Sequence, residues 1–240
     1  MSEANGNSLH SLVGLSGFRC IVADPPWPMP HTGARSPASS DKLGVHEAKG
    51  GRMVSGEWWG RFTGKSVKIP YQTMQVGEIA ALPVSGVADK HAHLYLWTVN
   101  RHIEDAYTIA RAWGFKPSTL LVWGKTPMGI GFGGTFCNSA EFCLFCRRGT
   151  LKAERRVDST WWHWSRPYVN GHIAHSAKPE AFQDMVESVS PGPRLELFAR
   201  RARPGWTVWG NEVEANAEGE SRADSARTLH PLVGSLDSKA

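Results

Sequence analysis

The sequence predicts an α/β fold in which a mostly parallel sheet is covered by helices on both faces. Short apolar runs typical of strands alternate with amphipathic helical segments, and this alternation is characteristic of parallel sheets enclosed by helices. The chain has 240 residues, of which 41% are hydrophobic and 20% charged. That length is enough for one domain with a full core. No apolar run approaches the ~20 residues that a membrane-spanning helix needs.

Six segments have the length and composition of strands. The first, residues 18–23, is an apolar run that ends where two prolines follow, because proline cannot continue the hydrogen-bonded ladder. The other expected strands are residues 92–97, 118–123, 141–147, 194–199 and 206–209.

Two helices are marked by apolar side chains three and four residues apart. The first has Asn100 as its expected N-cap and Gly114 as its expected end, since these residue types favour those positions. The second begins near Ser176 and carries Pro179 in its first turn, where proline is tolerated. A shorter helix is expected over residues 76–82.

We predict a single domain over residues 1–212 and a disordered tail over residues 213–240. Two long segments, at about 28–68 and 150–175, interrupt the alternation, and such loops at the ligand-binding edge of a sheet commonly bind a partner. The tail has five acidic and three basic residues and carries −2; because the whole chain carries +5, residues 1–212 carry +7. A basic body suits a polyanionic partner.

The N-terminal residues indicate an intracellular protein, and the four cysteines do not form the pattern of a disulfide framework. The start of the chain lacks the basic-then-apolar order of a signal peptide, so we expect a cytoplasmic location in a bacterial cell or a phage-infected host. Cys143 and Cys146 lie three residues apart in a strand-like run, and this spacing points the two side chains to opposite faces. We therefore expect two buried thiols rather than a zinc or redox pair, and no metal site.

Asp24-Pro25-Pro26-Trp27 directly follows the first strand, at the edge where open α/β sheets bind ligands. The 6-amino nitrogen of adenine is a weak nucleophile because its lone pair is delocalised into the purine ring. Asp24 can accept one of its N–H groups, the main-chain oxygen of Pro25 can accept the other, and the ring of Trp27 can stack on the purine. The alternative is a strand terminated by two prolines and followed by a core tryptophan.

The motif and six further blocks resemble, in order, the DPPW-motif adenine-N6 methyltransferase family. The blocks are residues 69–74, 94–97 with the following helix, 122–126, 141–144, 176–179 (Ser-Ala-Lys-Pro), and 195–200 together with 206–212. This family includes the catalytic subunit of the eukaryotic messenger-RNA adenosine methyltransferase and bacterial and phage relatives. The resemblance covers about residues 18–212 and implies a Rossmann-like fold that depends on S-adenosylmethionine.

The resemblance also implies a site. Asp24, Pro25, Pro26 and Trp27 would be catalytic, and Tyr71, Glu141 and Trp27 would border the target base. Asp24, Lys178, Arg200, Asn211 and Glu212 would bind the cofactor. The chain departs from the family at Ala177, where histidine is frequent, and at Glu212, where glutamine is familiar. The loop between Arg200 and Trp206 is also short, so contacts from that loop are not transferred.

A compact chain without a recognisable RNA-binding appendage resembles the family members that methylate adenine in DNA. Methylation of RNA is the alternative, and a catalytically inactive nucleic-acid-binding relative is the less favoured one. The resemblance is compatible with a homodimer or an unequal heterodimer. Candidate phosphate contacts in the two long loops are Arg35, Lys42, Lys49, Arg52, Arg61, Lys65 and Lys68, with Arg155, Arg156, His163 and Arg166 as weaker ones.

Tryptophan is unusually frequent, with 11 residues against four tyrosines. Two clusters, Trp58-Trp59 and Trp161-Trp162 with Trp164, lie among polar residues of the long segments. Such clusters can stack on unpaired bases or pin a long loop to the body of the protein, and the sequence leaves both roles open.

Overall fold

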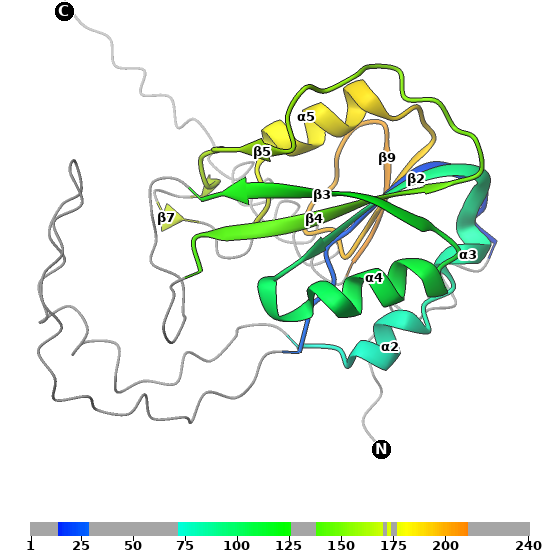
Figure 1. The fold of residues 1–240 in the computed structure, drawn as a ribbon, viewed down its shortest axis with the longest axis horizontal. Helices are drawn as coiled ribbons and strands as arrows, with labels where there is room; N and C mark the ends of the chain where they lie inside the picture. Colours follow the sequence, from blue (N-terminus) through cyan, green and yellow to red (C-terminus); the bar gives the residue numbers. More distant parts are fainter. Residues whose placement is uncertain (1–13, 29–71, 126–137, 170–171, 174–176, 211–240) are drawn as a thin grey trace, which may run out of the picture.

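The computed structural model describes residues 14–28, 72–125, 138–169, 172–173 and 177–210. Most of this part of the chain surrounds a seven-stranded sheet with the order β5-β3-β4-β2-β1-β8-β9 (Figure 1). Its strands are β1 (Phe18–Ala23), β2 (Ala88–Thr98), β3 (Lys116–Gly124), β4 (Ala140–Arg148), β5 (Trp161–Trp162), β8 (Arg194–Leu197) and β9 (Trp206–Trp209).

The sheet is mixed but mostly parallel, as predicted. β1 pairs in parallel with both β2 and β8, β8 pairs in parallel with β9, and β3 does so with β5. β4 alone runs antiparallel to both of its neighbours, β2 and β3. The start of β4 therefore lies at the edge where β2 and β3 end.

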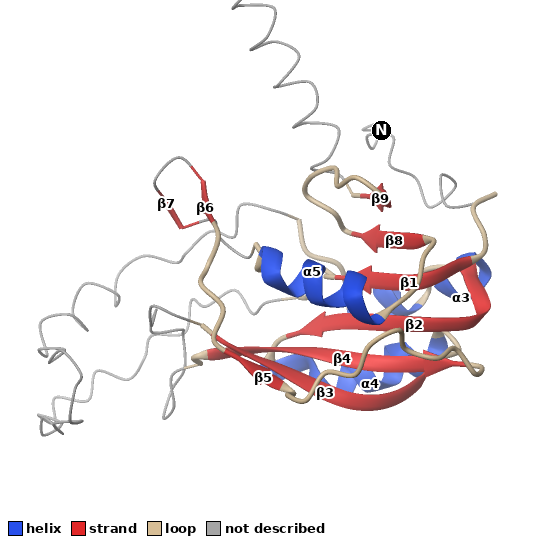
Figure 2. Cartoon of the chain, turned by 90° about the horizontal axis from the view of Figure 1, so that it is seen from above, coloured by secondary structure: helices blue, strands red, loops and turns tan. Residues whose placement is uncertain are grey.

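Helices cover both faces of the sheet, which confirms the predicted fold class. α2 (Val76–Ala80), α3 (Val84–Val87) and α4 (Ile103–Ala112) lie on one face, and α5 (Glu180–Val189) lies on the other (Figures 1 and 2). Two short strands, β6 (Tyr168–Val169) and β7 (His172–Ile173), pair with each other outside the main sheet.

Alternate residues of each central strand enter two separate cores. In β1, Ile21 and Ala23 pack beneath α4, whereas Cys20 and Val22 pack beneath α5. The same alternation separates Cys146 from Cys143 on β4, and both are buried. The expectation that these two thiols point to opposite faces is confirmed.

The first and last strands begin where predicted, and the middle ones are longer. β2, β3 and β4 each extend beyond the expected ranges, while β8 ends at Leu197, two residues early. Phe198 has a φ of 64°, a left-handed conformation that cannot continue a strand.

The ends of the helices required small corrections. Asn100 does not cap α4, because residues Asn100–His102 form a 3-10 turn (η2) and α4 begins at Ile103. Gly114, with a φ of 81°, ends that helix as predicted. α5 begins at Glu180, and Pro179 is its N-cap rather than a residue of its first turn.

Several predicted features lie outside the described residues. These are the tail over residues 213–240, most of the segment over residues 28–68, and the pair Trp58-Trp59. The segment over residues 150–175 is described in part and contains β5, β6 and β7. In the described ranges, no helix is both long and apolar enough to cross a membrane.

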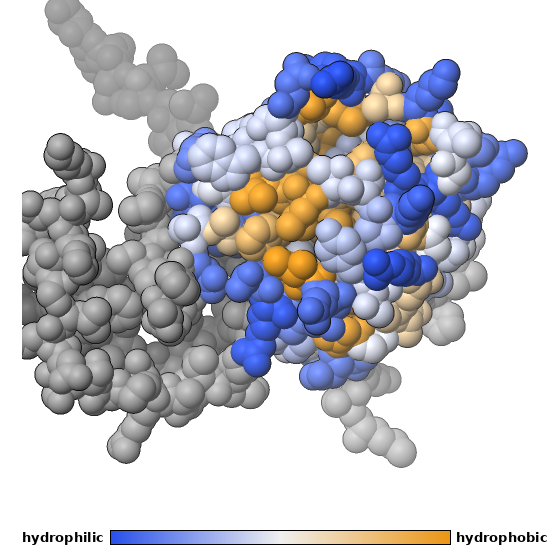
Figure 3. Space-filling view, viewed as in Figure 1, coloured by the Kyte–Doolittle hydropathy of each residue, from blue (hydrophilic) through white to orange (hydrophobic). Residues whose placement is uncertain are grey.

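One face of the described surface carries apolar side chains between the two helical layers. Figure 3 shows this patch over the part of the sheet where β3 lies, with hydrophilic side chains around it. β3 contributes the half-buried residues Leu120, Leu121 and Val122. Because β5 pairs only with Val122 and Trp123, much of the outer edge of β3 has no strand partner among the described residues.

Candidate active site

Four charged side chains meet at the edge of the sheet that holds the carboxyl ends of β1, β2 and β3. Asp24 directly follows β1, and Lys125 directly follows β3. Glu141 lies at the start of the antiparallel strand β4, opposite Trp123 of β3. Lys178 comes from the segment just before α5. Residues far apart in the sequence are thus brought together by the strand directions.

These side chains form a continuous chain of ion pairs. Lys178 Nζ lies 2.6 Å from Asp24 Oδ2 and 3.3 Å from Glu141 Oε2, and Glu141 Oε1 pairs with Lys125. Lys178 Nζ also lies 5.2 Å from the ring centroid of Trp97. The structure therefore unites three of the predicted site residues, Asp24, Glu141 and Lys178, and adds Lys125 to them.

Burial and neighbouring charges shift the pKa values of this group. Burial raises the pKa of Asp24, and the Lys178 ammonium opposes that shift without cancelling it. Burial also tends to raise the pKa of Glu141, but Lys178 and Lys125 outweigh it and lower that pKa. Burial tends to lower the pKa of Lys178, and the two carboxylates reverse this and raise it. Lys178 is therefore an ammonium, while Asp24 takes up a proton more readily than an exposed aspartate.

The DPPW turn, defined here as residues 24–27, is held by hydrogen bonds to several segments. Its first N–H, from Asp24, donates to Leu197 O of β8 over 3.4 Å. Met74 N–H donates to Pro26 O over 2.9 Å, and the indole Nε1–H of Trp27 donates to Trp97 O of β2 over 3.0 Å. Because its two prolines lack an N–H, the turn depends on these hydrogen bonds to other segments for its position.

The structure places Trp27 in the core. Its side chain is 5% exposed and packs in the cluster beneath α4, with its ring stacked on His102 at a centroid separation of 5.2 Å. A ring that stacks on a purine must present an open face, so the position matches the alternative of a core tryptophan. Pro25 O accepts the Trp27 N–H over 2.9 Å, and a carbonyl has a second lone pair for another donor.

Arg200 lies in the β8–β9 loop, defined here as residues 198–205. Its guanidinium is near enough to lower the pKa of Asp24, which supports its predicted place at the same edge. The beginning of the loop lies beside the end of β9, because Ala199 N–H donates to Trp209 O over 3.0 Å. A Cβ at Gly210 would collide with the Ala199 backbone, so the close approach requires glycine.

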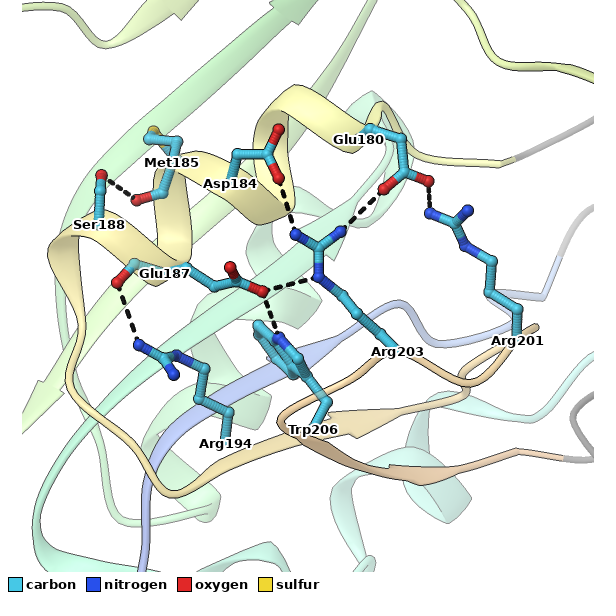
Figure 4. A network of polar contacts seen from close by, with 9 residues as sticks. All are labelled: Glu180, Asp184, Met185, Glu187, Ser188, Arg194, Arg201, Arg203 and Trp206. Carbon is cyan, nitrogen blue, oxygen red and sulfur yellow. Dashed lines mark hydrogen bonds and ion pairs between the residues drawn. The ribbon is translucent and has the colours of Figure 1, made fainter.

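A network of ion pairs joins this loop to α5 (Figure 4). Arg203 lies 2.8 Å from Glu180, 2.7 Å from Asp184 and 2.7 Å from Glu187, residues that line one face of the helix. Glu187 Oε1 also accepts the indole N–H of Trp206 over 2.7 Å. Arg203 thus ties the loop that carries Arg200 to the helix that follows Lys178.

Sequence reasoning missed three polar residues at or near this edge. Lys125 had a signal, because it lies two residues after a predicted strand. Glu196 also had one, since it interrupts an apolar strand; burial and the nearby charge of Asp24 raise its pKa to about 7. His102, 7% exposed, gave no signal, because it reaches the turn only through the fold.

Tyr71, Asn211 and Glu212 lie outside the described residues, as do the candidate cations of the first long loop.

The tryptophans of the second aromatic cluster differ in their surroundings. Trp162 and Trp164 are stacked with centroids 4.9 Å apart, and Trp164 O accepts the indole N–H of Trp123, so these two anchor the segment. Trp161 is 53% exposed. No group of three potential metal ligands occurs among the residues that the structure describes.

Comparison with known proteins gives one family match and several relatives. The sequence model of the MT-A70 family matches residues 53–212. The type II methyltransferase M.MunI from Mycoplasma sp is 28% identical over 154 residues. A Drosophila melanogaster protein described as an N(6)-adenosine-methyltransferase MT-A70-like protein is 29% identical over 158 residues. The human N(6)-adenosine-methyltransferase catalytic subunit METTL3 is 27% identical over 158 residues.

These matches cover most of this chain but less of the relatives. They include 63% of this chain and 63% of the Mycoplasma protein, and 62% of this chain against 25% of the fly and 26% of the human protein. The family match includes Glu141, Lys178 and Arg200. The DPPW turn precedes the matched range, and the contact of Lys178 with Asp24 joins it to that range.

Proposed function

The chain belongs to the MT-A70 family, and we propose that it transfers a methyl group from S-adenosylmethionine to the 6-amino nitrogen of adenine in DNA. Methyltransferases of this family use that cofactor. The observation that carries the proposal is the contact of Lys178 with Asp24 and Glu141 at the carboxyl edge of the sheet. It brings the family's matched segments to a turn whose chemistry suits an exocyclic amine.

The residues of this edge fit the charged groups of S-adenosylmethionine, which supplies an electrophilic methyl group when bound. The cofactor carries a carboxylate and an ammonium as well as a sulfonium. Lys178 and Arg200 are cations suited to its carboxylate, and the start of α5 offers backbone N–H groups of the same polarity. Asp24 is an anion suited to the positive groups. Asn211 and Glu212 remain predicted contacts to its ribose and adenine.

The DPPW turn and its neighbours perform the remaining tasks. Asp24, paired with Lys178, accepts one N–H of the adenine amine as a carboxylate, and the second lone pair of Pro25 O accepts the other. These two acceptors draw the nitrogen lone pair out of the ring and aim it, which is catalysis by preorganised electrostatics. Trp27, buried in the core on the α4 side of the sheet, anchors the turn. Glu141 borders the base, and its carboxylate pairs with both Lys178 and Lys125. Tyr71 remains a predicted contact to the target base.

DNA is the proposed polymer because the match with the Mycoplasma type II methyltransferase covers the same share, 63%, of both sequences. The fly and human relatives, named as adenosine methyltransferases, support RNA as the alternative. In duplex DNA the target adenine must leave the base stack to reach the turn. The cations of the two long segments are the proposed phosphate contacts.

The test is transfer of labelled methyl groups to single- and double-stranded DNA and RNA by wild type and Asp24→Asn. Cofactor binding is measured in parallel by calorimetry. Asp89→Asn is the matched control, because Asp89 lies at the opposite end of β2, where its carboxylate accepts the His91 N–H over 2.8 Å.

We expect label in adenine of DNA, retained in Asp89→Asn and reduced by at least ~100-fold in Asp24→Asn. Preferential labelling of RNA would overturn the choice of polymer and keep the reaction. Binding of polymers without methyl transfer to any of them would favour the inactive relative. Failure to bind S-adenosylmethionine would overturn the proposal as a whole.

A further inference from the structure

A histidine from the turn after β2 supports the DPPW turn from the α4 side. The ring of His102 is stacked on Trp27, with an interplanar angle of 12°. Its Nε2 lies 2.8 Å from Pro28 O, the carbonyl that directly follows the DPPW turn. Its Nδ1 lies 2.7 Å from Asp105 Oδ2 in the first turn of α4. One side chain thus contacts both the ring that anchors the DPPW turn and the backbone that leaves it.

Both hydrogen-bond partners of His102 are oxygen atoms without a proton to donate. The Asp105 carboxylate and the Pro28 carbonyl can only accept, so both bonds form together when both ring nitrogens carry a proton. The two hydrogen bonds and the stacking on Trp27 together favour a single orientation of His102.

The backbone of His102 is itself fixed to the end of β2. Its N–H donates to Val99 O over 2.9 Å, and its carbonyl accepts the hydroxyl of Thr98 over 3.0 Å. The same end of β2 provides Trp97 O, which accepts the indole N–H of Trp27. The end of β2 therefore contacts Trp27 in two ways: Trp97 O accepts its indole N–H, and His102 stacks on its ring.

The DPPW turn needs such support because it has few hydrogen-bond donors of its own. Two of its four residues are prolines, which have no N–H. Its reacting atoms in the proposed function are the Asp24 carboxylate and Pro25 O, and a displacement of ~1 Å at such atoms can cost about 100-fold in rate. A contact that holds both Trp27 and Pro28 restrains these atoms from the far end of the turn.

We propose that His102, oriented by Asp105, is a positioning residue that fixes the DPPW turn for methyl transfer. The inference rests on the proposed function. His102 touches the turn from the core side and acts through Trp27 and Pro28. Its loss is expected to lower kcat, while the affinity for S-adenosylmethionine stays close to that of wild type, because Lys178 and Arg200 are untouched.

The experiment uses four variants of the full chain. His102→Ala removes the stacking and both hydrogen bonds, His102→Phe keeps the stacked ring alone, and Asp105→Asn leaves His102 with a neutral partner. His91→Ala is the matched control, because His91 Nδ1 accepts the Thr150 N–H over 3.0 Å at the opposite end of β2. The measured quantities are kcat, KM for the polymer, cofactor Kd, Tm, and the NMR signal of the Trp27 indole N–H, assigned with Trp27→Phe.

We expect His102→Ala and His102→Phe to lower kcat by about 10- to 100-fold, with cofactor Kd changed by less than about threefold. Asp105→Asn has a smaller effect of the same kind, and the Trp27 indole signal shifts in each. His91→Ala lowers Tm and leaves kcat unchanged.

Wild-type kcat in both His102 variants would overturn the inference. The inference would also be overturned if kcat fell with Tm in His91→Ala by the same ratio as in the His102 variants. A purely structural role of His102 predicts that result. The NMR signal separates this inference from the proposed function. An inactive wild type would contradict the function, whereas an unchanged Trp27 signal in His102→Ala would contradict the support of the turn.

Discussion

The DPPW turn and the β8–β9 loop follow neighbouring parallel strands and reach the same edge of the sheet, but different forces hold them. The turn is fixed by a buried indole, a stacked histidine and hydrogen bonds to backbone oxygens. The loop is fixed by Arg203, which pairs with Glu180, Asp184 and Glu187 of α5. The side chains of these acids are 50%, 67% and 35% exposed.

This difference assigns separate physical properties to the two regions. Contacts between buried aromatic groups depend little on salt, and removing them leaves a cavity. Ion pairs with exposed partners contribute little one at a time and are screened by salt, although one arginine shared by several carboxylates forms a stronger network. We therefore expect the turn, which aims the acceptors, to be rigid, and the loop, which carries a predicted cofactor contact, to be easier to open.

The largest effect is expected from breaking the turn. Trp27→Ala removes a buried ring and should lower the free energy of unfolding by about 3–5 kcal/mol, with loss of methyl transfer. Trp27→Phe keeps most of the ring but loses the hydrogen bond to Trp97 O, and should cost about 1 kcal/mol and most of kcat. Urea unfolding and kinetics of each variant measure the two effects.

Trp113→Phe is the control that separates stability from positioning. Trp113 is buried in the same core, and its indole N–H donates to Ile79 O over 3.2 Å. The chemical change is the same, but the indole of Trp113 is bonded to α2 rather than to the end of β2 that holds the turn. An equal loss of kcat in Trp27→Phe and Trp113→Phe would show that Trp27 acts through stability alone.

Breaking the loop should have a smaller and different effect. Arg203→Met removes all three ion pairs and should lower the free energy of unfolding by about 1–2 kcal/mol. The affinity for S-adenosylmethionine should fall by roughly tenfold with kcat little changed, because binding must then order the loop. Calorimetry measures the affinity. Arg111→Met is the control, since Arg111 is exposed and lies over the Tyr107 ring 5.7 Å from its centroid, away from the edge.

The sequence predicted the parts of the fold and site that depend on local pattern. The short apolar run of residues 18–23 and the prolines after it located β1 and its end correctly. Lys178 and Glu141 were predicted from motif order, and the structure places both in one chain of ion pairs with Asp24. Arg200 was predicted in the same way, and its charge acts on Asp24. The roles of all three residues stay predictions.

Features that depend on three-dimensional packing could not be predicted. Trp27 was interpreted as a stacking surface, because its sequence position does not show that α4 and His102 would enclose it. The role of Arg203 depends on three acids one helical turn apart on α5 and on the direction of a loop that follows another strand. Neither relation leaves a signal in nearby sequence.

Salt should distinguish the two regions without any mutation. Raising sodium chloride from about 0.05 M to about 0.5 M shortens the screening length roughly threefold. Hydrogen exchange at residues 198–205 should then become faster, whereas exchange at the Trp27 and Met74 amides, bonded within and to the turn, should stay the same. Arg203→Met should weaken the salt dependence of the loop, and the ion pair of Arg201 with Glu180 should retain part of it. Equal acceleration in both regions would mean that the two are held by the same kind of contact.

Acid should separate the regions in the opposite order to salt. Burial raises the pKa of Asp24, so kcat/KM should begin to fall on acidification above the ordinary carboxyl range of about 4. The hydrogen bond from Arg203 lowers the pKa of Glu187. Its contribution to stability is complete above the unfolded-state pKa and is lost only as the pH falls through the lower folded-state value. Asp24 has the opposite sign, because folding disfavours its ionised form and protonation relieves that cost.

We predict that, as the pH falls, methyl transfer stops before the loop is released from α5. The pH profile of kcat/KM locates the first event, and hydrogen exchange at residues 198–205 locates the second. Glu141→Gln sharpens the result, because the Glu141 charge raises the pKa of Asp24, and its removal should move the acid limb of the profile to lower pH. The opposite result would be a loop that opens at or above the pH at which activity is lost. Loss of activity in acid would then follow from release of the β8–β9 loop rather than from protonation of Asp24.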